Sequence, residues 1–256
     1  MKLSIITVNL NNLDGLKETV GSVINQDYKD VEYIIIDGDS TDGSKEFIEE
    51  NKEKFQYTVI EKDKGVYDAM NKGIKVASGE YLFFLNSGDT FYSNTTLSTF
   101  FANKPTEDIV YGNACIVYLN KARKIKKHQQ EINLLTSLTE TITHQAMFLK
   151  KELFKDNLYN VEYKLISDWI FYFEQIILNN KTSKYIDVVI ANFLTAGLSS
   201  NAKLLEEERK KYFTNTFSEN YYNLYKLMLT SHGKYNALKN QSVVKFLIRI
   251  KNKFKF

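Results

Sequence analysis

Proline, cysteine and tryptophan are nearly absent from this sequence, with one of each in 256 residues. The single cysteine, Cys115, cannot form an internal disulfide or a thiolate metal cage, which excludes a disulfide-stapled miniprotein and favours a reducing compartment. We expect Cys115 to lie in the core. With Pro105 as the single proline, the sequence has no proline-containing linker that would mark a boundary between two domains. The three histidines are too scattered in sequence to predict a zinc site.

Long apolar runs are absent too, since none approaches the roughly 18 residues that a membrane-spanning helix needs. The first eight residues lack the layout of a cleavable signal and predict a strand instead. Hydrophobic residues make up 43% and charged residues 25% of the chain, which is ordinary for a globular protein and excludes a disordered one. The length suits one large domain, or one domain with an appendage.

Acidic residues are missing from the end of the chain. Eight basic residues and no acidic ones lie between Asn220 and Phe256, whereas the preceding residues hold 26 basic and 31 acidic ones, a net charge of −5. Residues 242–256 add an apolar stripe, so a basic amphipathic helix is predicted there. Such a helix can lie in an anionic membrane interface, bind nucleic acid, or pack against the body or another copy. The motifs of nucleic-acid-binding proteins are missing, and we favour the membrane.

Strand and helix patterns alternate along the first half of the chain. Short apolar runs, typical of strands buried on both faces, are separated by amphipathic helical stripes. The strands are predicted over Leu3–Val8, Val31–Asp37, Tyr57–Glu61 and Tyr81–Leu85, and the helices over Leu13–Gln26, Ser44–Asn51 and Val66–Ala77. This order predicts an open, mostly parallel α/β sheet. Further strands are expected over Asp108–Tyr111 and Cys115–Leu119, and helices over Ser167–Asn179 and Ala202–Leu229.

Polar side chains follow each of the first four predicted strands. Asn9 follows the first, residues 37–43 the second, residues 63–65 the third and residues 86–89 the fourth. The carboxyl ends of parallel strands meet at one edge of a sheet, where the ligands of such folds bind. Carboxylates beside lysine and glycine at that edge suit a divalent cation, Mg²⁺ or Mn²⁺, together with a phosphorylated ligand.

Several common ligand motifs are absent from these turns. The turn after the first strand, residues 9–15, lacks the G-x-G-x-x-G pattern of dinucleotide-binding domains. The chain also has no G-x-x-x-x-G-K-[ST] phosphate loop and no G-x-S-x-G nucleophile elbow. The ligand must therefore be held differently, and a metal bridging a diphosphate is one candidate.

Four ordered motifs of the first half closely resemble those of the inverting glycosyltransferases of family two. The motifs are Ser4–Asn9, Ile35–Ser44, Asp63–Gly73 and Gly79–Asp89. The resemblance is dense over residues 1–115 and weaker to about residue 200. It implies the GT-A fold, an α/β fold with a Rossmann-like, mostly parallel central sheet flanked by helices.

The same resemblance implies a division of the chain. We expect a GT-A glycosyltransferase domain over residues 1–200, followed by a basic helical C-terminal extension over residues 201–256. Within the domain, residues 1–115 would form the nucleotide-sugar-binding half and residues 116–200 the acceptor half.

The resemblance also implies which residues of this sequence bind the nucleotide-sugar donor. The residues expected to bind the nucleotide-sugar are Thr7, Asn9, Asp37, Asp39, Asp63, Lys64, Asn86, Ser87 and Gly88. The loop after the second strand usually reads Asp-Asp-Gly-Ser in this family, and Gly38 replaces its second aspartate here. Which aspartate of this loop contacts the base therefore stays open.

Residues 86–89 occupy the place of the family's D-x-D motif. Asn86 replaces the first aspartate and can still hydrogen-bond a ribose hydroxyl, while Asp89 remains as the candidate ligand for Mn²⁺ or Mg²⁺. One carboxylate fewer predicts weaker metal binding that depends more on the bound diphosphate.

The catalytic base is expected later, because Ile166–Trp169 resembles the family's catalytic-aspartate segment. Asp168 would take the proton from an acceptor hydroxyl as that oxygen attacks the anomeric carbon in a single inverting displacement. His144 and Ser199 lie in two further segments with family resemblance, and each is a candidate contact to the diphosphate or the acceptor. The Q-x-x-R-W motif of processive synthases is absent, which favours addition of one sugar per cycle.

Simpler explanations stay open for several of these residues. Asp37 and Asp42 suit turn and cap positions, and Asp168 suits the N-cap of its helix. His144 suits the role of an ordinary buried or surface histidine. Tyr67, within the third motif, is expected to pack rather than to contact a ligand.

These features together predict a cytoplasmic glycosyltransferase, peripheral at the inner face of the membrane, that moves one sugar from a UDP-sugar to a glycan or lipid-linked acceptor. Assembly of a bacterial surface polysaccharide, such as a capsule or lipopolysaccharide, is the expected setting. One alternative is a degenerate protein that binds nucleotide-sugar or membrane without turnover, which the change at Asn86 favours. Another is a sugar-1-phosphate nucleotidyltransferase, although its Gly-rich, Arg-containing first loop is missing. Nucleic acid is not an expected partner.

Overall fold

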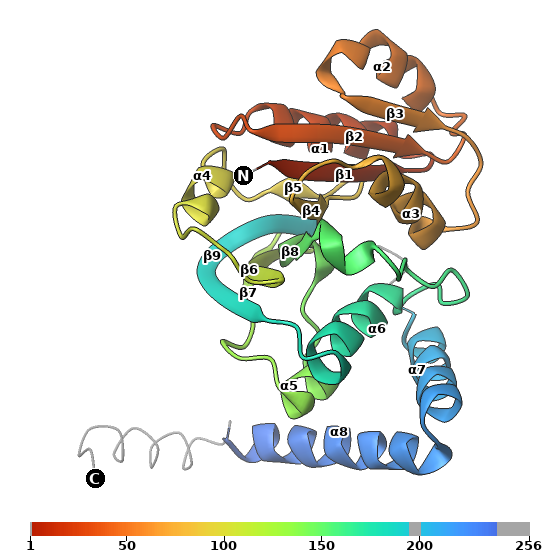
Figure 1. Ribbon diagram of the computed structural model, residues 1–256, viewed down its shortest axis with the longest axis vertical. Coiled ribbons are helices and arrows are strands. Elements are labelled where there is room, and N and C mark those ends of the chain that lie inside the picture. The colour runs from red at the N-terminus through yellow and green to blue at the C-terminus, as the bar shows by residue number, and fades with distance from the viewer. Residues whose placement is uncertain (1, 195–200, 240–256) are drawn as a thin grey trace.

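One sheet of nine strands organises the part of the chain that the structure describes, residues 2–194 and 201–239. In this computed structural model the strand order is β3-β2-β1-β4-β8-β6-β9-β5, and β7 pairs with β6 outside that path. Helices flank the sheet, and two further helices follow it at the C-terminal end (Figure 1).

The first four strands are parallel and alternate with three helices. They are β1 (Leu3–Asn9), α1 (Leu13–Ile24), β2 (Val31–Asp37), α2 (Ser44–Glu50), β3 (Tyr57–Ile60), α3 (Val66–Val76) and β4 (Tyr81–Phe84). β1 lies between β2 and β4, and β3 pairs with the other side of β2. All seven predicted elements are confirmed, with ends that differ by at most two residues.

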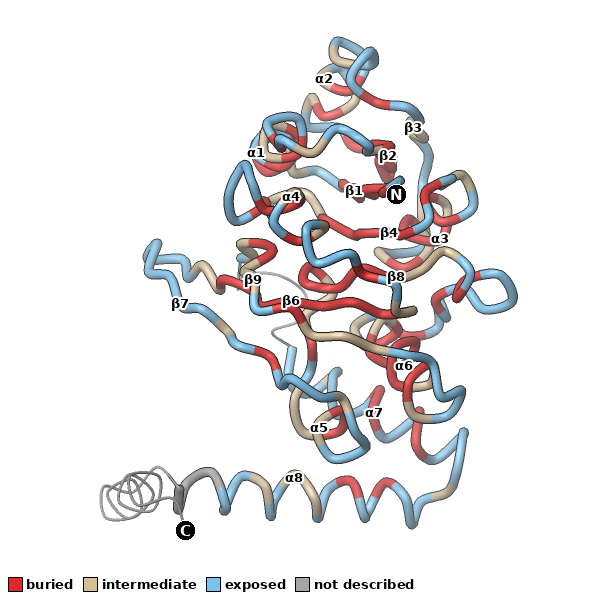
Figure 2. The backbone as a smooth tube through the Cα atoms, turned by 60° about the vertical axis from the view of Figure 1, so that its left-hand side comes forward, coloured by how far each residue is buried: buried red, intermediate tan, exposed pale blue. Residues whose placement is uncertain are grey.

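Side chains of these strands alternate between two hydrophobic clusters, one on each face of the sheet. Ile6 and Phe84 belong to the cluster that contains residues of α3, whereas Ile5 and Phe83 belong to the cluster that contains residues of α1 and α2. Because both faces are covered, β1, β2 and β4 are buried along most of their length, whereas β3 at the edge is more exposed (Figure 2). Their polar carboxyl ends are therefore the places where side chains can meet a ligand.

The second half of the sheet is mixed. Its strands are β5 (Thr90–Phe91), β6 (Ile109–Val117), β7 (Arg123–Lys126), β8 (Met147–Lys150) and β9 (Ser183–Leu194). β8 joins β4 and β6 in antiparallel pairs, β6 and β9 run parallel, and β9 curves until its end pairs with β5 (Figure 1). The predicted α/β fold class is confirmed, and the parallel order is concentrated in the first half.

β6 corrects one expectation, because the strands predicted over Asp108–Tyr111 and Cys115–Leu119 form a single strand. Gly112 lies where the register with β9 shifts, and a Cβ atom at this position would lie 2.5 Å from the carbonyl oxygen of Val188. Glycine permits this close approach, so the strand continues through the irregularity. Cys115, in the same strand, is buried and free, as predicted.

Short helical elements complete the body of the protein. They are α4 (Thr96–Phe101), α5 (Leu134–Thr139), α6 (Ser167–Phe173), a π-helical turn over Glu174–Leu178, and 3₁₀ turns over Lys52–Lys54, His144–Ala146 and Lys151–Phe154. α6 and the π-helical turn together account for the helix predicted over Ser167–Asn179.

The helix predicted over Ala202–Leu229 is two helices, α7 (Ala202–Thr216) and α8 (Glu219–Lys239). The backbone leaves the helical region at Phe217, where φ is −124° and ψ is −88°. The Phe217 ring packs against Tyr212 and Phe213 of α7. This aromatic packing accompanies the bend between α7 and α8. Hydrophobic periodicity in the sequence did not predict that bend.

α8 lies along the outside of the body and carries many exposed residues (Figure 2). Of the helices that the structure describes, none is both long and apolar enough to cross a membrane. The basic helix predicted over residues 242–256 lies outside the described residues.

Candidate active site

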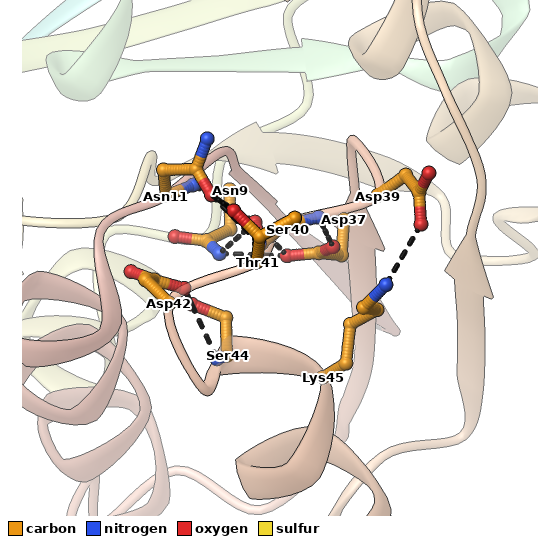
Figure 3. A network of polar contacts seen from close by, with 9 residues as sticks. All are labelled: Asn9, Asn11, Asp37, Asp39, Ser40, Thr41, Asp42, Ser44 and Lys45. Atoms are coloured by element: carbon orange, nitrogen blue, oxygen red, sulfur yellow. Dashed lines mark hydrogen bonds and ion pairs between the residues drawn. The ribbon is translucent and has the colours of Figure 1, made fainter.

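The loops after β1 and β2 are tied together by Asp37. This carboxylate is fully buried and accepts hydrogen bonds from Asn9 Nδ2 at 2.7 Å, from Ser40 Oγ at 2.8 Å and from the Ser40 backbone N–H at 2.8 Å (Figure 3). Asn11 extends the network, because its backbone N–H donates to Ser40 Oγ. The geometry fits the turn interpretation of Asp37, since its carboxylate holds the loop and exposes no surface.

Asp39 and Asp42 serve different parts of the same loop (Figure 3). Asp39 has a left-handed backbone (φ 69°) and is partly exposed, and its ion pair with Lys45, at 2.9 Å, lowers the pKa of the Asp39 carboxyl. Asp42 accepts hydrogen bonds from the backbone N–H groups of Leu13 and Ser44, which joins the starts of α1 and α2. Asp42 therefore acts as a turn residue, while Gly43 rather than Asp42 is the N-cap of α2, and Asp39 lies at the surface.

Thr7 and Lys64 differ sharply in exposure. Thr7 is fully buried, with its hydroxyl 3.1 Å from that of Tyr33 on β2. Lys64 is exposed, and its backbone N–H donates to the carboxylate of Asp68 in the first turn of α3. Lys64 thus lies at the edge of the sheet, whereas the Thr7 side chain is enclosed within the fold.

Gly38 and Asp63 approach each other closely across the β2 and β3 loops. Asp63 Oδ1 accepts a hydrogen bond from the Gly65 backbone N–H at 2.9 Å. A Cβ atom at position 38 would lie 2.5 Å from Asp63 Oδ2. The space that a second aspartate of the loop would need is therefore taken by the carboxylate of Asp63.

The turn after β4, residues 86–89, packs against the start of α1. Gly88 has a φ of 96°, and its backbone N–H donates to Thr19 Oγ1 at 3.0 Å. Asn12 Nδ2 donates to the backbone carbonyl of Ser87. Asp89 is buried and accepts a hydrogen bond from Gln145 Nε2 at 2.8 Å. Burial raises the pKa of Asp89 to about 6, even though the Gln145 hydrogen bond opposes that effect.

His144 connects the turn after β4 to Asp168 at the start of α6. Its Nε2 lies 3.3 Å from Asn86 Nδ2, and its Nδ1 lies 3.4 Å from Asp168 Oδ2. The two ring nitrogens of His144 thus face different partners, Nε2 the Asn86 amide and Nδ1 the Asp168 carboxylate, and a proton on Nδ1 would be donated to Asp168. His144 is therefore not an isolated histidine, because it links the turn after β4 to the first turn of α6.

Asp168 has a second partner from the opposite half of the chain. Tyr67, in the first turn of α3, donates its hydroxyl to Asp168 Oδ1 at 2.7 Å. Burial alone would raise the pKa of Asp168, but hydrogen bonding and charge interaction with His144, and the Tyr67 hydrogen bond, lower it overall. The carboxyl is consequently ionised at neutral pH. Because its oxygens face Tyr67 and His144 and α6 has no side-chain N-cap, the cap interpretation of Asp168 is wrong.

Sequence reasoning missed two residues of this cluster. Tyr67 packs its ring against Tyr159, as expected, but its hydroxyl also reaches Asp168. Gln145 reaches Asp89, and its only signal in the sequence was its place beside His144. Ser199, the last predicted contact, lies outside the described residues.

Few side chains near this turn could coordinate a divalent cation. In residues 2–194 and 201–239, no three His, Cys, Asp or Glu side chains are grouped so that they could hold a metal ion. Asn86 Oδ1 is buried without a hydrogen-bond partner, and Asp89 supplies one carboxylate nearby in sequence. One amide oxygen and one carboxylate suit a Mg²⁺ or Mn²⁺ ion that completes its shell with substrate phosphates. The residues present therefore fit a divalent cation that is coordinated partly by the protein and partly by the phosphates of the substrate.

A curved α/β sheet with polar tips converging at the carboxyl ends of β1 to β4 is the GT-A fold. Two solved structures show the same fold. One is Staphylococcus aureus TarS 1-349 in complex with UDP-GlcNAc (18% identity, TM-score 0.65, covering 90% of this chain and 70% of that one). The other is the mannosyltransferase PcManGT from Pyrobaculum calidifontis in complex with GDP-Man and Mn²⁺ (14% identity, TM-score 0.59, covering 99% and 80%).

The chain belongs to glycosyl transferase family 2, whose family model matches residues 4–164. A PGL/p-HBAD biosynthesis glycosyltransferase of Mycobacterium bovis (strain BCG / Pasteur 1173P2) is 29% identical over 215 residues, which cover 81% of this chain and 82% of that protein. The family match contains the turns after β1 to β4 and His144. It ends shortly before Asp168 and does not include α7 or α8.

Proposed function

We propose that this glycosyltransferase moves a single sugar from a nucleotide-sugar, a UDP-sugar in the first instance, to a hydroxyl of a glycan or lipid-linked acceptor, with inversion at the anomeric carbon. The observation that carries the proposal is the position of Asp168. A partly buried, ionised carboxylate from α6 is held by Tyr67 and His144, and His144 in turn contacts Asn86 in the turn that matches the D-x-D motif.

Asp168 has the properties that a general base needs. Its lowered pKa keeps the carboxylate in the ionised form that a base requires, and its two partners fix its orientation. It would remove the proton of the acceptor hydroxyl while that oxygen attacks the anomeric carbon and the nucleoside diphosphate departs. A single displacement of this kind turns an α-linked donor into a β-linked product.

The donor would lie across the tips of β1 to β4. Asp39, Asp63 and Lys64 lie there on loops that reach the surface, while Asp37 and Asn9 hold the loops in place. UDP-GlcNAc and GDP-Man in the two structural neighbours support a nucleotide-sugar as the ligand class. Asp89 and Asn86 would hold Mn²⁺ or Mg²⁺ with the donor diphosphate, and the ion would stabilise charge on the leaving group.

The setting is proposed from charge and exposure. The chain between Asn220 and Phe256 carries eight basic and no acidic residues. α8 also exposes large apolar side chains, namely Tyr221, Leu224, Leu227 and Tyr235. Both features suit an anionic membrane surface, which would place the enzyme at the cytoplasmic face of the inner membrane, where lipid-linked acceptors of surface polysaccharides such as capsule or lipopolysaccharide are extended.

Donor-dependent release of UDP or GDP tests the reaction. A panel of nucleotide-sugars would be incubated with Mn²⁺ and wild type, Asp89→Ala or Asp168→Asn. We expect hydrolysis of one donor by wild type, loss of it in Asp89→Ala, and donor binding without transfer in Asp168→Asn. Release of pyrophosphate instead of a nucleoside diphosphate would identify a nucleotidyltransferase. Binding of a donor without turnover on a broad acceptor panel would identify a degenerate protein.

A further inference from the structure

The segment that leads into the catalytic helix is held by a buried glutamate from α7. Glu208 is 6% exposed, and its two carboxylate oxygens accept hydrogen bonds from consecutive backbone N–H groups, Lys164 at 2.6 Å and Leu165 at 3.0 Å. Asp168 lies three residues after Leu165, in the first turn of α6. A two-oxygen, two-donor arrangement fixes both the position and the direction of the backbone at this point.

The next residue of α7 contacts the catalytic helix itself. The guanidinium carbon of Arg209 lies 3.2 Å from the ring centroid of Trp169, the residue after Asp168. Arg209 is 5% exposed, and its Nη2 lies 3.5 Å from Thr141 Oγ1. Trp169 is held from its other side, because its Nε1 donates to the Ser137 carbonyl at 2.8 Å. The indole is therefore clamped between α5 and α7.

A third contact reaches the far end of the same helix. Tyr212 donates its hydroxyl to Glu174 at 3.0 Å, just after the last residue of α6, and its ring packs edge-on against Trp169. α7 consequently touches the segment before α6, the first turn of α6, and the π-helical turn that follows it. A seven-residue helix has little stability of its own and depends on such packing.

We propose that α7 positions the catalytic base, with Glu208 and Arg209 as positioning residues that hold α6 where Asp168 can meet His144 and Tyr67. The inference rests on the proposed role of Asp168. It assigns a function in the reaction to the C-terminal extension in addition to membrane contact. It also means that the catalytic geometry depends on a segment that the family model does not match.

Buried charge adds a second contribution from Arg209. Burial lowers the pKa of Arg209 to about 10, so the guanidinium remains charged at neutral pH. Asp168 is among the groups that attract this charge. The Arg209 cation and the Asp168 carboxylate therefore attract each other, in addition to the packing of Arg209 on Trp169.

The substitution Glu208→Gln tests the proposal, and Glu207→Gln is its matched control. Gln has one acceptor oxygen and presents an N–H₂ group to a backbone N–H, so one of the two hydrogen bonds is lost. Glu207 lies on the same helix but is 60% exposed and reaches only Lys203, at 3.9 Å. We expect kcat to fall by about tenfold or more in Glu208→Gln, because a small misplacement of a catalytic group is costly. The donor KM and nucleotide affinity should stay within about twofold of wild type, since the contacts of Glu208 and Arg209 are with α6, the segment before it and Thr141.

Trp169 supplies a second readout that does not require activity. It is the only tryptophan of the chain and is 1% exposed. Its fluorescence should become more accessible to acrylamide in Glu208→Gln and in Arg209→Met, and stay unchanged in Glu207→Gln. Arg209→Lys, which keeps the charge but not the planar stacking, should lie between wild type and Arg209→Met.

Three results would overturn the inference. One is a Glu208→Gln variant whose kcat and Trp169 quenching both equal those of wild type. Another is a lower melting temperature with unchanged kcat, which would reduce Glu208 to a structural role. The third is joint loss of nucleotide binding and kcat, which would mean that α7 supports the whole sheet. A wild type without turnover on any donor would instead remove the proposed function, while Trp169 quenching would still test the link between α7 and α6.

Discussion

The hydroxyl of Tyr67 and the carboxylate of Asp168 meet at 2.7 Å although 101 residues separate them in the chain. Tyr67 belongs to α3, in the half of the protein that resembles a nucleotide-sugar-binding unit. Asp168 lies in the first turn of α6, in the half that we propose to hold the acceptor. Their hydrogen bond therefore joins the two halves at the place where donor and acceptor would react.

Removal of the Tyr67 hydroxyl should change the pH dependence of transfer. The Tyr67 hydrogen bond lowers the pKa of Asp168, so its loss in Tyr67→Phe raises that pKa. The acidic limb of the kcat profile should move to higher pH, and kcat at neutral pH should fall by about tenfold. Tyr159→Phe is the control, because the ring that packs on Tyr67 is kept and the bond to Asp168 is left in place. An unchanged acidic limb in Tyr67→Phe would contradict the role of Asp168 as base.

Asp89→Asn should stabilise the protein while abolishing its chemistry. The folded-state pKa of Asp89, about 6, lies above the value near 4 of a free aspartate, so the buried anion costs stability. The folded state binds more protons between these two values, so this contribution makes stability fall as the pH rises through them. Above pH 6 we expect a higher melting temperature for Asp89→Asn than for wild type, and no difference at pH 4. Mn²⁺ with UDP should stabilise wild type and leave Asp89→Asn unchanged.

Asn86→Asp should tighten metal binding. The substitution restores the first carboxylate of the D-x-D pattern at a position whose amide oxygen is buried and unpartnered. Hard divalent cations gain affinity with each added carboxylate, and we expect about a tenfold gain for Mn²⁺ in the presence of UDP. Isothermal titration with Mn²⁺ measures it, with Asn94→Asp, at an exposed position outside this turn, as the control. Equal Mn²⁺ affinity in wild type and Asn86→Asp would show that position 86 does not face the cation.

Gly38→Ala should displace the carboxylate of Asp63. The new Cβ would lie 2.5 Å from Asp63 Oδ2, so the β2 and β3 loops must separate. We expect a higher donor KM and a loss of about 1–3 kcal/mol in the free energy of unfolding. Gly21→Ala is the control, because nothing lies within 4 Å of its Cβ and alanine is favoured within a helix. A normal donor KM in Gly38→Ala would exclude Asp63 from the donor site.

Truncation after Gln241 should separate membrane binding from donor binding. It removes four lysines and one arginine of the basic tail but leaves α7 and α8 intact. Flotation with anionic vesicles should show release of the truncated protein, and its nucleotide affinity should equal that of the full chain. Continued binding to these vesicles would contradict the membrane role of residues 242–256.

Much of the first half could be predicted because its signals are local. The nearly continuous apolar runs of β1, β2 and β4 and the stripes of the intervening helices each lie within one segment of sequence. The parallel order then places their polar ends at one edge. The position of Asp168 near that edge was predicted from a resemblance rather than from its surroundings.

What could not be predicted depends on contacts between distant segments. The burial of Asp37, the approach of Gly38 to Asp63, and the bond from Tyr67 to Asp168 each join residues from different loops or helices. The corner at Phe217 arises from aromatic packing, which helical periodicity does not encode. Sequence patterns therefore identified the candidate residues, but they did not show which of them hold the loops and which of them can face a ligand.

Glu208 and Arg209 lie late in the sequence, so the ribosome makes the proposed donor site before it makes the residues that position the base. β1 to β4 are made first and pair largely with one another, whereas the clamp on α6 comes from residues about 40 positions after the base. If the proposed roles hold, a chain halted before α7 would carry the donor-side loops without a fixed base. Such a fragment would retain sugar-nucleotide without transferring it, so premature termination would yield a competitor for the donor rather than a weak enzyme.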